Sequence, residues 1–146
     1  EILIGLVGSE MCIRDSTCDM TKEKLDFIYR LKTSALIEAS MMIGAVLAGA
    51  TGSEQKIVEA VASKVGLAFQ IQDDILDVTS TMEVLGKPIG SDEKNHKSTY
   101  VTYEGIEKAK QDVADLSEKA IAQMETLVVK NEFLTELLRY LISREK

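Results

Sequence analysis

The sequence predicts an all-α protein, and three observations support this prediction. Hydrophobic residues make up 45% of the 146 residues, whereas aromatic residues make up only 5% and Trp is absent. There is a single Pro, and residues that favour helices dominate the composition. Apolar residues recur at spacings of three and four, which is the period of an amphipathic helix. We therefore expect one domain, or one piece of a larger domain, with some five helical segments.

The first helical pattern covers about residues 22–49 and follows Thr21, a residue type that favours the N-cap position. We expect a helix or a pair of helices there, ending at Gly49 or Gly52. The apolar stripe of this segment runs through Leu25, Ile28, Leu31, Leu36, Ala39, Ile43 and Leu47.

A second helix is expected from Glu54 to Val78, with Ser53 as its N-cap residue. Its apolar positions again recur at spacings of three and four, at Ile57, Val61, Val65, Ala68, Ile71, Ile75 and Val78. The helix is long, and it is apolar enough to lie near the centre of the fold.

Polar and turn-forming residues fill the segment 79–99, so a long loop is expected there. A loop of this length in a compact protein is usually functional or mobile. Helical periodicity returns over about residues 103–129, and a final helix is expected over about 132–143. Residues 1–20 show neither helical nor strand periodicity, so we treat them as a segment separate from a unit spanning 21–146.

Composition also excludes several functional classes. With 17 basic and 24 acidic residues the net charge is −7, which argues against non-specific nucleic-acid binding. Cys12 and Cys18 do not make a disulfide framework, so a reducing, cytoplasmic setting is expected. The longest apolar stretch, residues 35–50, includes Glu38 and is shorter than the roughly 20 residues of a membrane span. No transmembrane segment is predicted.

The segment that carries chemistry is FQIQDDILD, residues 69–77, at the end of the second expected helix. On a helix Asp73 and Asp77 share one face, and Asp74 lies about 100° round the axis. These carboxylates repel one another, and the helix dipole disfavours anions near the C-terminal end. A divalent cation such as Mg²⁺ would relieve both effects. A solvated acidic helix end is the alternative interpretation.

Lysines accompany this acidic segment. Lys32 follows the start of the first helix, and Lys87 and Lys97 lie in the polar loop directly after the aspartates. Each lysine alone is most simply a surface residue. Together, an acidic helix face and several lysines are what a diphosphate ligand needs, because magnesium bridges carboxylates to phosphate oxygens and ammonium groups neutralise the remaining charge.

The segments FQIQDDILDV (69–78), LGKPIGSD (85–92) and KSTY (97–100) resemble the motifs of trans-prenyltransferases, the polyprenyl synthetases. Within that family the chain is most similar to bacterial farnesyl and geranylgeranyl diphosphate synthases. The likeness runs over 21–146. It implies the C-terminal part of a polyprenyl synthetase domain, which is a partial isoprenoid-synthase helical bundle.

The resemblance also implies a role for each matching residue. The aspartates that would hold Mg²⁺ on the allylic diphosphate are Asp73, Asp74 and Asp77. The lysines that would contact this diphosphate are Lys32, Lys87 and Lys97. Thr33 and Gln70 match a polar pair whose oxygens face the allylic carbocation, so Lys32, Thr33 and Gln70 are the expected catalytic residues. Phe69 matches a residue of the pocket wall.

The reaction implied by the resemblance is a prenyl transfer. An allylic diphosphate ionises with the help of Mg²⁺, the double bond of isopentenyl diphosphate attacks the cation, and a proton is lost. The resemblance further implies a homodimer for the full-length enzyme.

The sequence departs from the family pattern near its start. The family's first aspartate-rich motif has no counterpart here, and residues 1–16 do not match the family. We therefore expect a fragment that has little prenyl-transfer activity by itself. Two alternatives from other classes are a non-catalytic helical subunit of a heteromeric prenyl synthase and a generic acidic helical interaction module.

Overall fold

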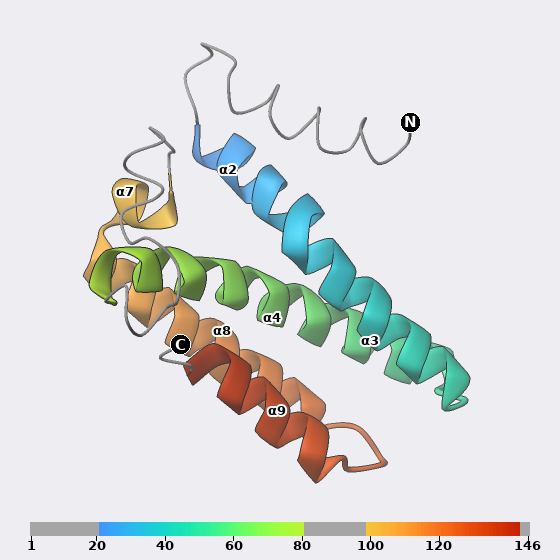
Figure 1. Cartoon of the computed structure of the whole chain (residues 1–146). Coiled ribbons are helices and arrows are strands. Elements are labelled where there is room, and N and C mark those ends of the chain that lie inside the picture. Colours follow the sequence, from blue (N-terminus) through green and yellow to red (C-terminus); the bar gives the residue numbers. More distant parts are fainter. Residues whose placement is uncertain (1–20, 81–98, 144–146) are drawn as a thin grey trace.

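The computed structural model describes residues 21–80 and 99–143 (Figure 1). Within these two ranges all the regular structure is helical, which confirms the predicted all-α class. The elements are α2 (Lys22–Tyr29), the π-helix η1 (Arg30–Ser34), α3 (Ala35–Leu47), α4 (Gly52–Thr79), α7 (Tyr100–Glu104), α8 (Ile106–Met124) and α9 (Glu132–Ser143). Residues 1–20 and most of the expected polar loop lie outside the described residues.

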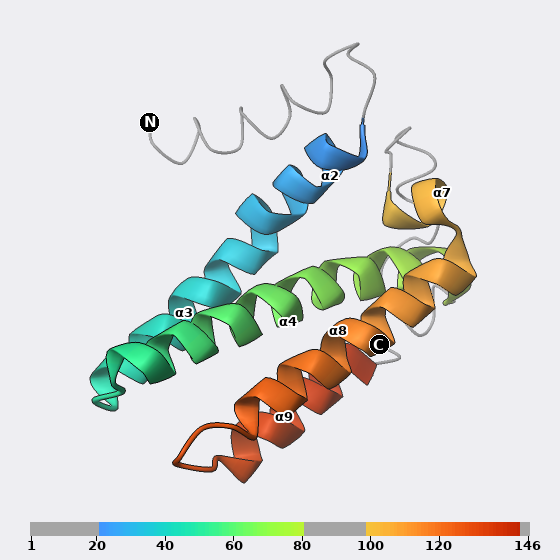
Figure 2. The same cartoon turned by 180° about the vertical axis from the view of Figure 1, so that it is seen from behind.

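The segments α2, η1 and α3 follow one another without a break and form one rod, as expected for the first helical pattern (Figures 1 and 2). The side chain of Thr21 caps α2 by accepting a hydrogen bond from the N–H of Lys24 at 3.4 Å. The π-helical turn within the rod was not predicted from the sequence. Such turns hold one residue more per turn than an α-helix and occur often at functional sites.

Helix α4 is the central element and packs against every other helix of the described part (Figure 1). The predicted stripe is buried from Val61 to Ile75, but Val78 is 56% exposed. The predicted N-cap is wrong, because Thr51 and not Ser53 caps the helix. Thr51 and Glu54 form a capping box, in which each side chain bonds to the backbone N–H of the other.

The segment after the loop is divided differently from the prediction. Instead of one helix over about 103–129, α7 begins at Tyr100 under a cap from Thr99, and α8 ends at Met124. Gly105 separates the two helices with a φ of +80°, a conformation that favours glycine. The final helix, α9, has the predicted bounds and lies antiparallel to α8 (Figure 2).

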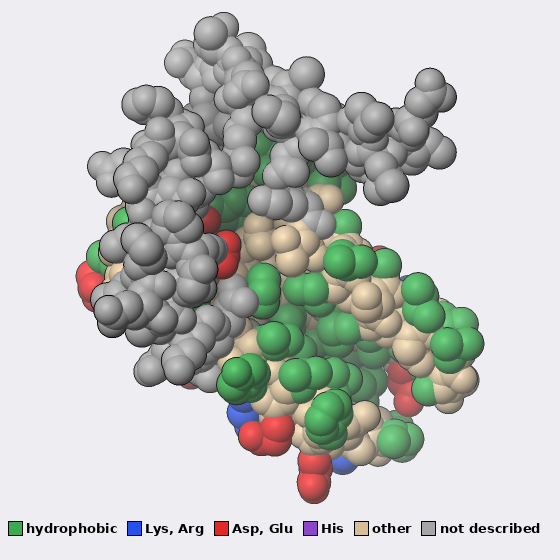
Figure 3. All heavy atoms as spheres, in the orientation of Figure 1, with side chains coloured by type: hydrophobic (Ala, Val, Ile, Leu, Met, Phe, Trp, Pro, Cys, Tyr) green, Lys and Arg blue, Asp and Glu red, His purple; other side chains and the backbone are tan. Residues whose placement is uncertain are grey.

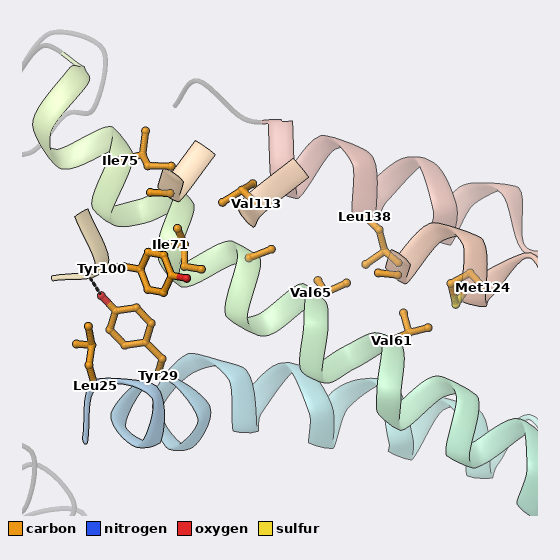
Figure 4. Close-up of a cluster of buried hydrophobic side chains, with 13 residues drawn as sticks. Leu25, Tyr29, Val61, Val65, Ile71, Ile75, Tyr100, Val113, Met124 and Leu138 are labelled. Atoms are coloured by element: carbon orange, nitrogen blue, oxygen red, sulfur yellow. Dashed lines mark hydrogen bonds between the residues drawn. The ribbon is translucent and has the colours of Figure 1, made fainter. Parts of the chain in front are cut away.

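The core is a cluster of side chains between α4 and its neighbours (Figure 4). Val61, Val65 and Ile71 of α4 are fully buried. Residues from α2, α7, α8 and α9 close around them, and the two tyrosines of the cluster, Tyr29 and Tyr100, lie near the C-terminal part of α4. This arrangement fixes the end of α2 and the start of α7 against the aspartate end of α4.

Helix α3 departs from the predicted apolar stripe. None of its residues is buried, and several large apolar side chains of the rod are more than half exposed, namely Leu31, Leu36, Ile43, Val46 and Leu47. Hydrophobic side chains gather over α3 and α9 on the face seen in Figure 3. Among the described helices none has both the length and the apolar character that crossing a membrane requires.

Candidate functional site

Two carboxylates share one face at the end of α4. Asp73 and Asp77 lie one helical turn apart. Asp77 is buried, with 6% of its surface exposed, and Asp73 is half-buried. The last turn of α4 contains no basic residue, and the helix dipole is negative at this end. A cation bound near these carboxylates would therefore be stabilised by both the side chains and the helix end.

Asp74 is engaged in a different direction. Its Oδ2 accepts a hydrogen bond from the hydroxyl of Tyr29, the last residue of α2. The same oxygen accepts a hydrogen bond of 2.8 Å from the backbone N–H of Tyr100, the first residue of α7. This N–H also lies 3.1 Å from the Tyr29 hydroxyl oxygen (Figure 4). Asp74 thus connects α4 to two elements that are distant from it in the sequence.

The carboxylates of the described residues suit a metal ion that is also coordinated by a bound ligand. No group of three His, Cys, Asp or Glu side chains in residues 21–80 and 99–143 is placed to hold a metal ion. Asp73 and Asp77 remain as a pair on one face. Mg²⁺ commonly binds through one or two carboxylates and completes its shell with waters and phosphate oxygens, so this pair fits such a site. The assignment of all three aspartates to the metal stays a prediction.

The π-helix η1 lies against α4 one turn before the acidic segment. Ser34 of η1 is buried and touches Gly66 of α4. Gln70 follows Gly66 by one turn, and Thr33 is the neighbour of Ser34. Both Thr33 and Gln70 are half-buried. The predicted polar pair therefore belongs to two elements in direct contact.

The other predicted site residues are placed less completely. Phe69 is half-buried on α4, adjacent to Gln70. Lys32 belongs to η1, beside Thr33. Lys87 and Lys97 lie outside the described residues, so their contact with a diphosphate stays a prediction.

Sequence reasoning did not find the tyrosines that hold this end of the molecule. The hydroxyl of Tyr100 donates a hydrogen bond of 2.8 Å to Oδ2 of Asp112 on α8, and Asp112 also pairs with Lys108. Burial of the phenol and its bond to Asp112 raise the pKa of Tyr100, so its hydroxyl remains a donor at neutral pH. No periodic pattern marks Tyr29 or Tyr100, since their partners are more than ten residues away.

Comparison with known proteins agrees with the motifs. The model of the family described as "Polyprenyl synthetase" matches residues 8–138. The geranylgeranyl diphosphate synthase of Cyanophora paradoxa is 44% identical, over 80% of this chain and 39% of that protein. The farnesyl diphosphate synthase of Geobacillus stearothermophilus is 32% identical, over 99% of this chain and 51% of that protein. The chain thus spans about two-fifths to one-half of the length of these two relatives.

Solved structures share the fold. The heptaprenyl diphosphate synthase from Staphylococcus aureus superposes with a TM-score of 0.85 at 22% identity, over 99% of this chain and 57% of that one. A geranyltransferase from Helicobacter pylori, complexed with magnesium and isoprenyl diphosphate, gives a TM-score of 0.73 at 32% identity, over 94% of this chain and 45% of that one. The boundary expected near residue 20 stays a prediction, because the family match begins within residues 1–20, which lie outside the described residues. With its matched motifs, helical architecture and family match over residues 8–138, the chain belongs to the polyprenyl synthetase family.

Proposed function

We propose that this chain provides the allylic diphosphate-binding side of a trans-prenyl diphosphate synthase. The observation that carries the proposal is the pair Asp73 and Asp77 on one face of the central helix, the same helix that contacts the η1 turn containing Thr33. The acceptor substrate of the whole protein would be isopentenyl diphosphate, and the product would be a longer allylic diphosphate. Membership of the family and the presence of magnesium and isoprenyl diphosphate in the Helicobacter pylori relative support this proposal.

The residues of this chain would divide the work as follows. Asp73 and Asp77 would hold Mg²⁺, and Asp74 is the third candidate from the resemblance. The ion, when bound, neutralises charge that develops on the departing diphosphate. Lys32, Lys87 and Lys97 would contact the phosphate oxygens and neutralise the remaining charge.

The apolar environment around the aspartates would protect the allylic cation. Thr33 and Gln70 would direct oxygen atoms toward the carbon that ionises, and Phe69 would form part of the pocket wall. Because the helical core next to this segment is tightly packed and apolar, it would keep water away from the cation, which would otherwise give an alcohol. A homodimer and a cytoplasmic location are further proposals for the whole protein.

The decisive experiment measures Mg²⁺-dependent diphosphate binding. Isothermal titration of the purified chain with inorganic pyrophosphate, with Mg²⁺ and then with EDTA, is expected to give binding only when the metal is present. Asp73→Asn is expected to weaken this binding by at least about tenfold, since even outer-shell partners of a metal site contribute 10- to 100-fold.

Asp115→Asn is the matched control, because Asp115 lies on α8 and accepts a hydrogen bond of 2.7 Å from Gln111. This variant is expected to bind like the unaltered chain. If pyrophosphate does not bind, or binds equally without metal, the proposal is wrong and a non-catalytic helical subunit becomes the better interpretation.

A further inference from the structure

Asp74 joins the aspartate end of α4 to two other elements. One of its carboxylate oxygens already accepts two hydrogen bonds, from the Tyr29 hydroxyl and from the Tyr100 N–H. The Tyr29 hydroxyl is itself an acceptor for the same N–H at 3.1 Å. The three groups therefore form a closed triangle of hydrogen bonds, which we call the Asp74 clamp.

The partners of Asp74 are fixed by packing. Tyr29 is 6% exposed and Tyr100 is 8% exposed, and both side chains belong to the hydrophobic core (Figure 4). Tyr100 is held a second time by its hydroxyl, which donates to Asp112 of α8. A carboxylate bonded to two such rigid groups is not easily turned toward a ligand, because the turn would break the hydrogen bonds that the Tyr29 hydroxyl and the Tyr100 N–H donate to it.

The clamp lies where it can control the geometry of the site. Tyr29 directly precedes η1, the turn that contains Lys32 and Thr33. Tyr100 begins the helix that follows the lysine-containing segment in the sequence. A loss of the clamp would release η1 and the start of α7 from the aspartate end of α4. A misplacement of about 1 Å can reduce catalysis by about 100-fold.

We propose that Asp74 is a positioning residue that fixes η1 and the start of α7 against α4, whereas Asp73 and Asp77 serve the metal. This inference rests on the proposed function for its catalytic meaning. It revises the role that the resemblance gives to Asp74. The side-chain oxygen, rather than the negative charge, is what the clamp requires.

Asp74→Asn tests this distinction, since the amide keeps an oxygen acceptor and removes the charge. If Asp74 positions the segments, the affinity of Asp74→Asn for Mg²⁺ and pyrophosphate is expected to stay within about threefold of the unaltered chain. Asp74→Ala and Tyr29→Phe both break the clamp. Both are expected to weaken binding by about tenfold. Asp74→Ala, which also removes the acceptor of the Tyr100 N–H, is expected to accelerate hydrogen exchange of that amide by at least about tenfold.

The opposite pattern overturns the proposal. If Asp74 binds the metal directly, Asp74→Asn will lose at least about tenfold in affinity, as Asp73→Asn does, and Tyr29→Phe will leave the affinity unchanged. Tyr29→Phe removes only one oxygen from a packed ring, so it serves if Asp74→Ala does not fold.

The two proposals fail separately. If the unaltered chain binds no pyrophosphate, the proposed function fails, and exchange of the Tyr100 amide then decides whether the clamp exists. Faster exchange in Asp74→Ala supports the clamp, and unchanged exchange refutes it. Asp73→Asn is the control for this measurement and is expected to leave the Tyr100 amide as protected as in the unaltered chain.

Discussion

Ser34 of η1 and Gly66 of α4 approach each other so closely that no further carbon atom fits between them. A Cβ placed on Gly66 would lie 2.6 Å from Cβ of Ser34 and 2.7 Å from its Cα. Gly66 therefore allows the π-helical turn to rest directly on the central helix. The relative position of Thr33 and Gln70 depends on this contact.

Gly66→Ala is expected to destabilise the fold. The added carbon would force the backbone of η1 away from α4, and overpacking of this kind costs typically 1–3 kcal/mol. The higher helix propensity of Ala returns about 1 kcal/mol of this. A net loss of up to about 2 kcal/mol in the free energy of unfolding should appear in urea denaturation.

Gly44→Ala provides the matched control for Gly66→Ala. Gly44 lies within α3, and a Cβ placed there meets no atom of the described part of the chain within 4 Å. This variant is expected to gain up to about 1 kcal/mol from helix propensity alone. Equal effects of the two substitutions would contradict the close approach of η1 and α4.

Ser34→Ala is expected to be neutral or stabilising. Ser34 is 1% exposed, and its Oγ is buried with no hydrogen-bond partner within residues 21–80 and 99–143. A buried hydroxyl without a partner costs about 1–3 kcal/mol, and the substitution removes it while keeping Cβ in contact with Gly66. Thermal denaturation followed by circular dichroism would measure the change. A large loss of stability would reveal a hydrogen bond that this geometry lacks.

Thr51→Ala is expected to lower the free energy of unfolding by about 1 kcal/mol at neutral pH, because it removes the N-cap of α4. Hydrogen bonds from the backbone and side chain of Thr51 hold the pKa of Glu54 below its ordinary value of 4.5. The contribution of the Glu54 carboxylate to the free energy of unfolding is therefore present above pH 4.5 and is lost as the pH falls through the lowered pKa. Urea denaturation at neutral pH and at about pH 3 should show the effect of Thr51→Ala shrinking in acid.

Ser53→Ala serves as the control for the cap, since Ser53 is exposed and α4 begins one residue before it. It is expected to leave stability unchanged. If Ser53→Ala were the more damaging of the two variants, the cap would be misassigned.

Tyr100 is expected to make the fold sensitive to alkaline pH. Burial of the phenol and its hydrogen bond to Asp112 raise its pKa above the ordinary value of 10.0. The folded state therefore holds this proton more tightly than the unfolded state. The resulting stabilisation is complete below pH 10.0 and is lost as the pH rises through the raised pKa.

Tyr100→Phe removes this alkaline dependence together with the bond to Asp112. Its free energy of unfolding is expected to be lower by about 1–2 kcal/mol at neutral pH and to fall less steeply above pH 10.0. Tyr140→Phe is the comparison, because Tyr140 is 68% exposed. Denaturation curves across the alkaline range distinguish the two, and identical slopes for both variants would contradict the role of Tyr100.

Periodicity was sufficient to predict the central and final helices. The apolar positions of α4 recur over about six turns, and Asp73 and Asp77 stand out because they add charge to an otherwise apolar helix. The sequence also contains the signal of the observed cap of α4, since Thr51 and Glu54 have the spacing of a capping box. The prediction of Ser53 as the cap is wrong because two hydroxyl residues, Thr51 and Ser53, lie within three positions.

Long-range contacts could not be predicted in the same way. Tyr29 and Asp74 are 45 residues apart, and a sequence pattern that reports helix faces does not report which faces meet. The exposure of Leu36 and Leu47 could not be predicted for the same reason, because the sequence of an apolar stripe is the same whether or not another helix covers it. Gly105 divides α7 from α8 through its positive φ. The apolar period of 3.6 residues continues across this glycine, so the pattern did not reveal the division.

The π-helical turn sets the rotational phase of the rod on either side of it. Its widened loop accommodates one residue beyond the ordinary helical repeat, and each residue corresponds to about 100° of rotation. Shortening Arg30–Ser34 by one residue would leave a straight helix but would swing Leu25 and Tyr29 away from α4 while α3 stayed in place. Deletions are therefore expected to be far more damaging in this turn than point substitutions. The buried faces of α2 and α3 also have to be predicted on two separate helical wheels.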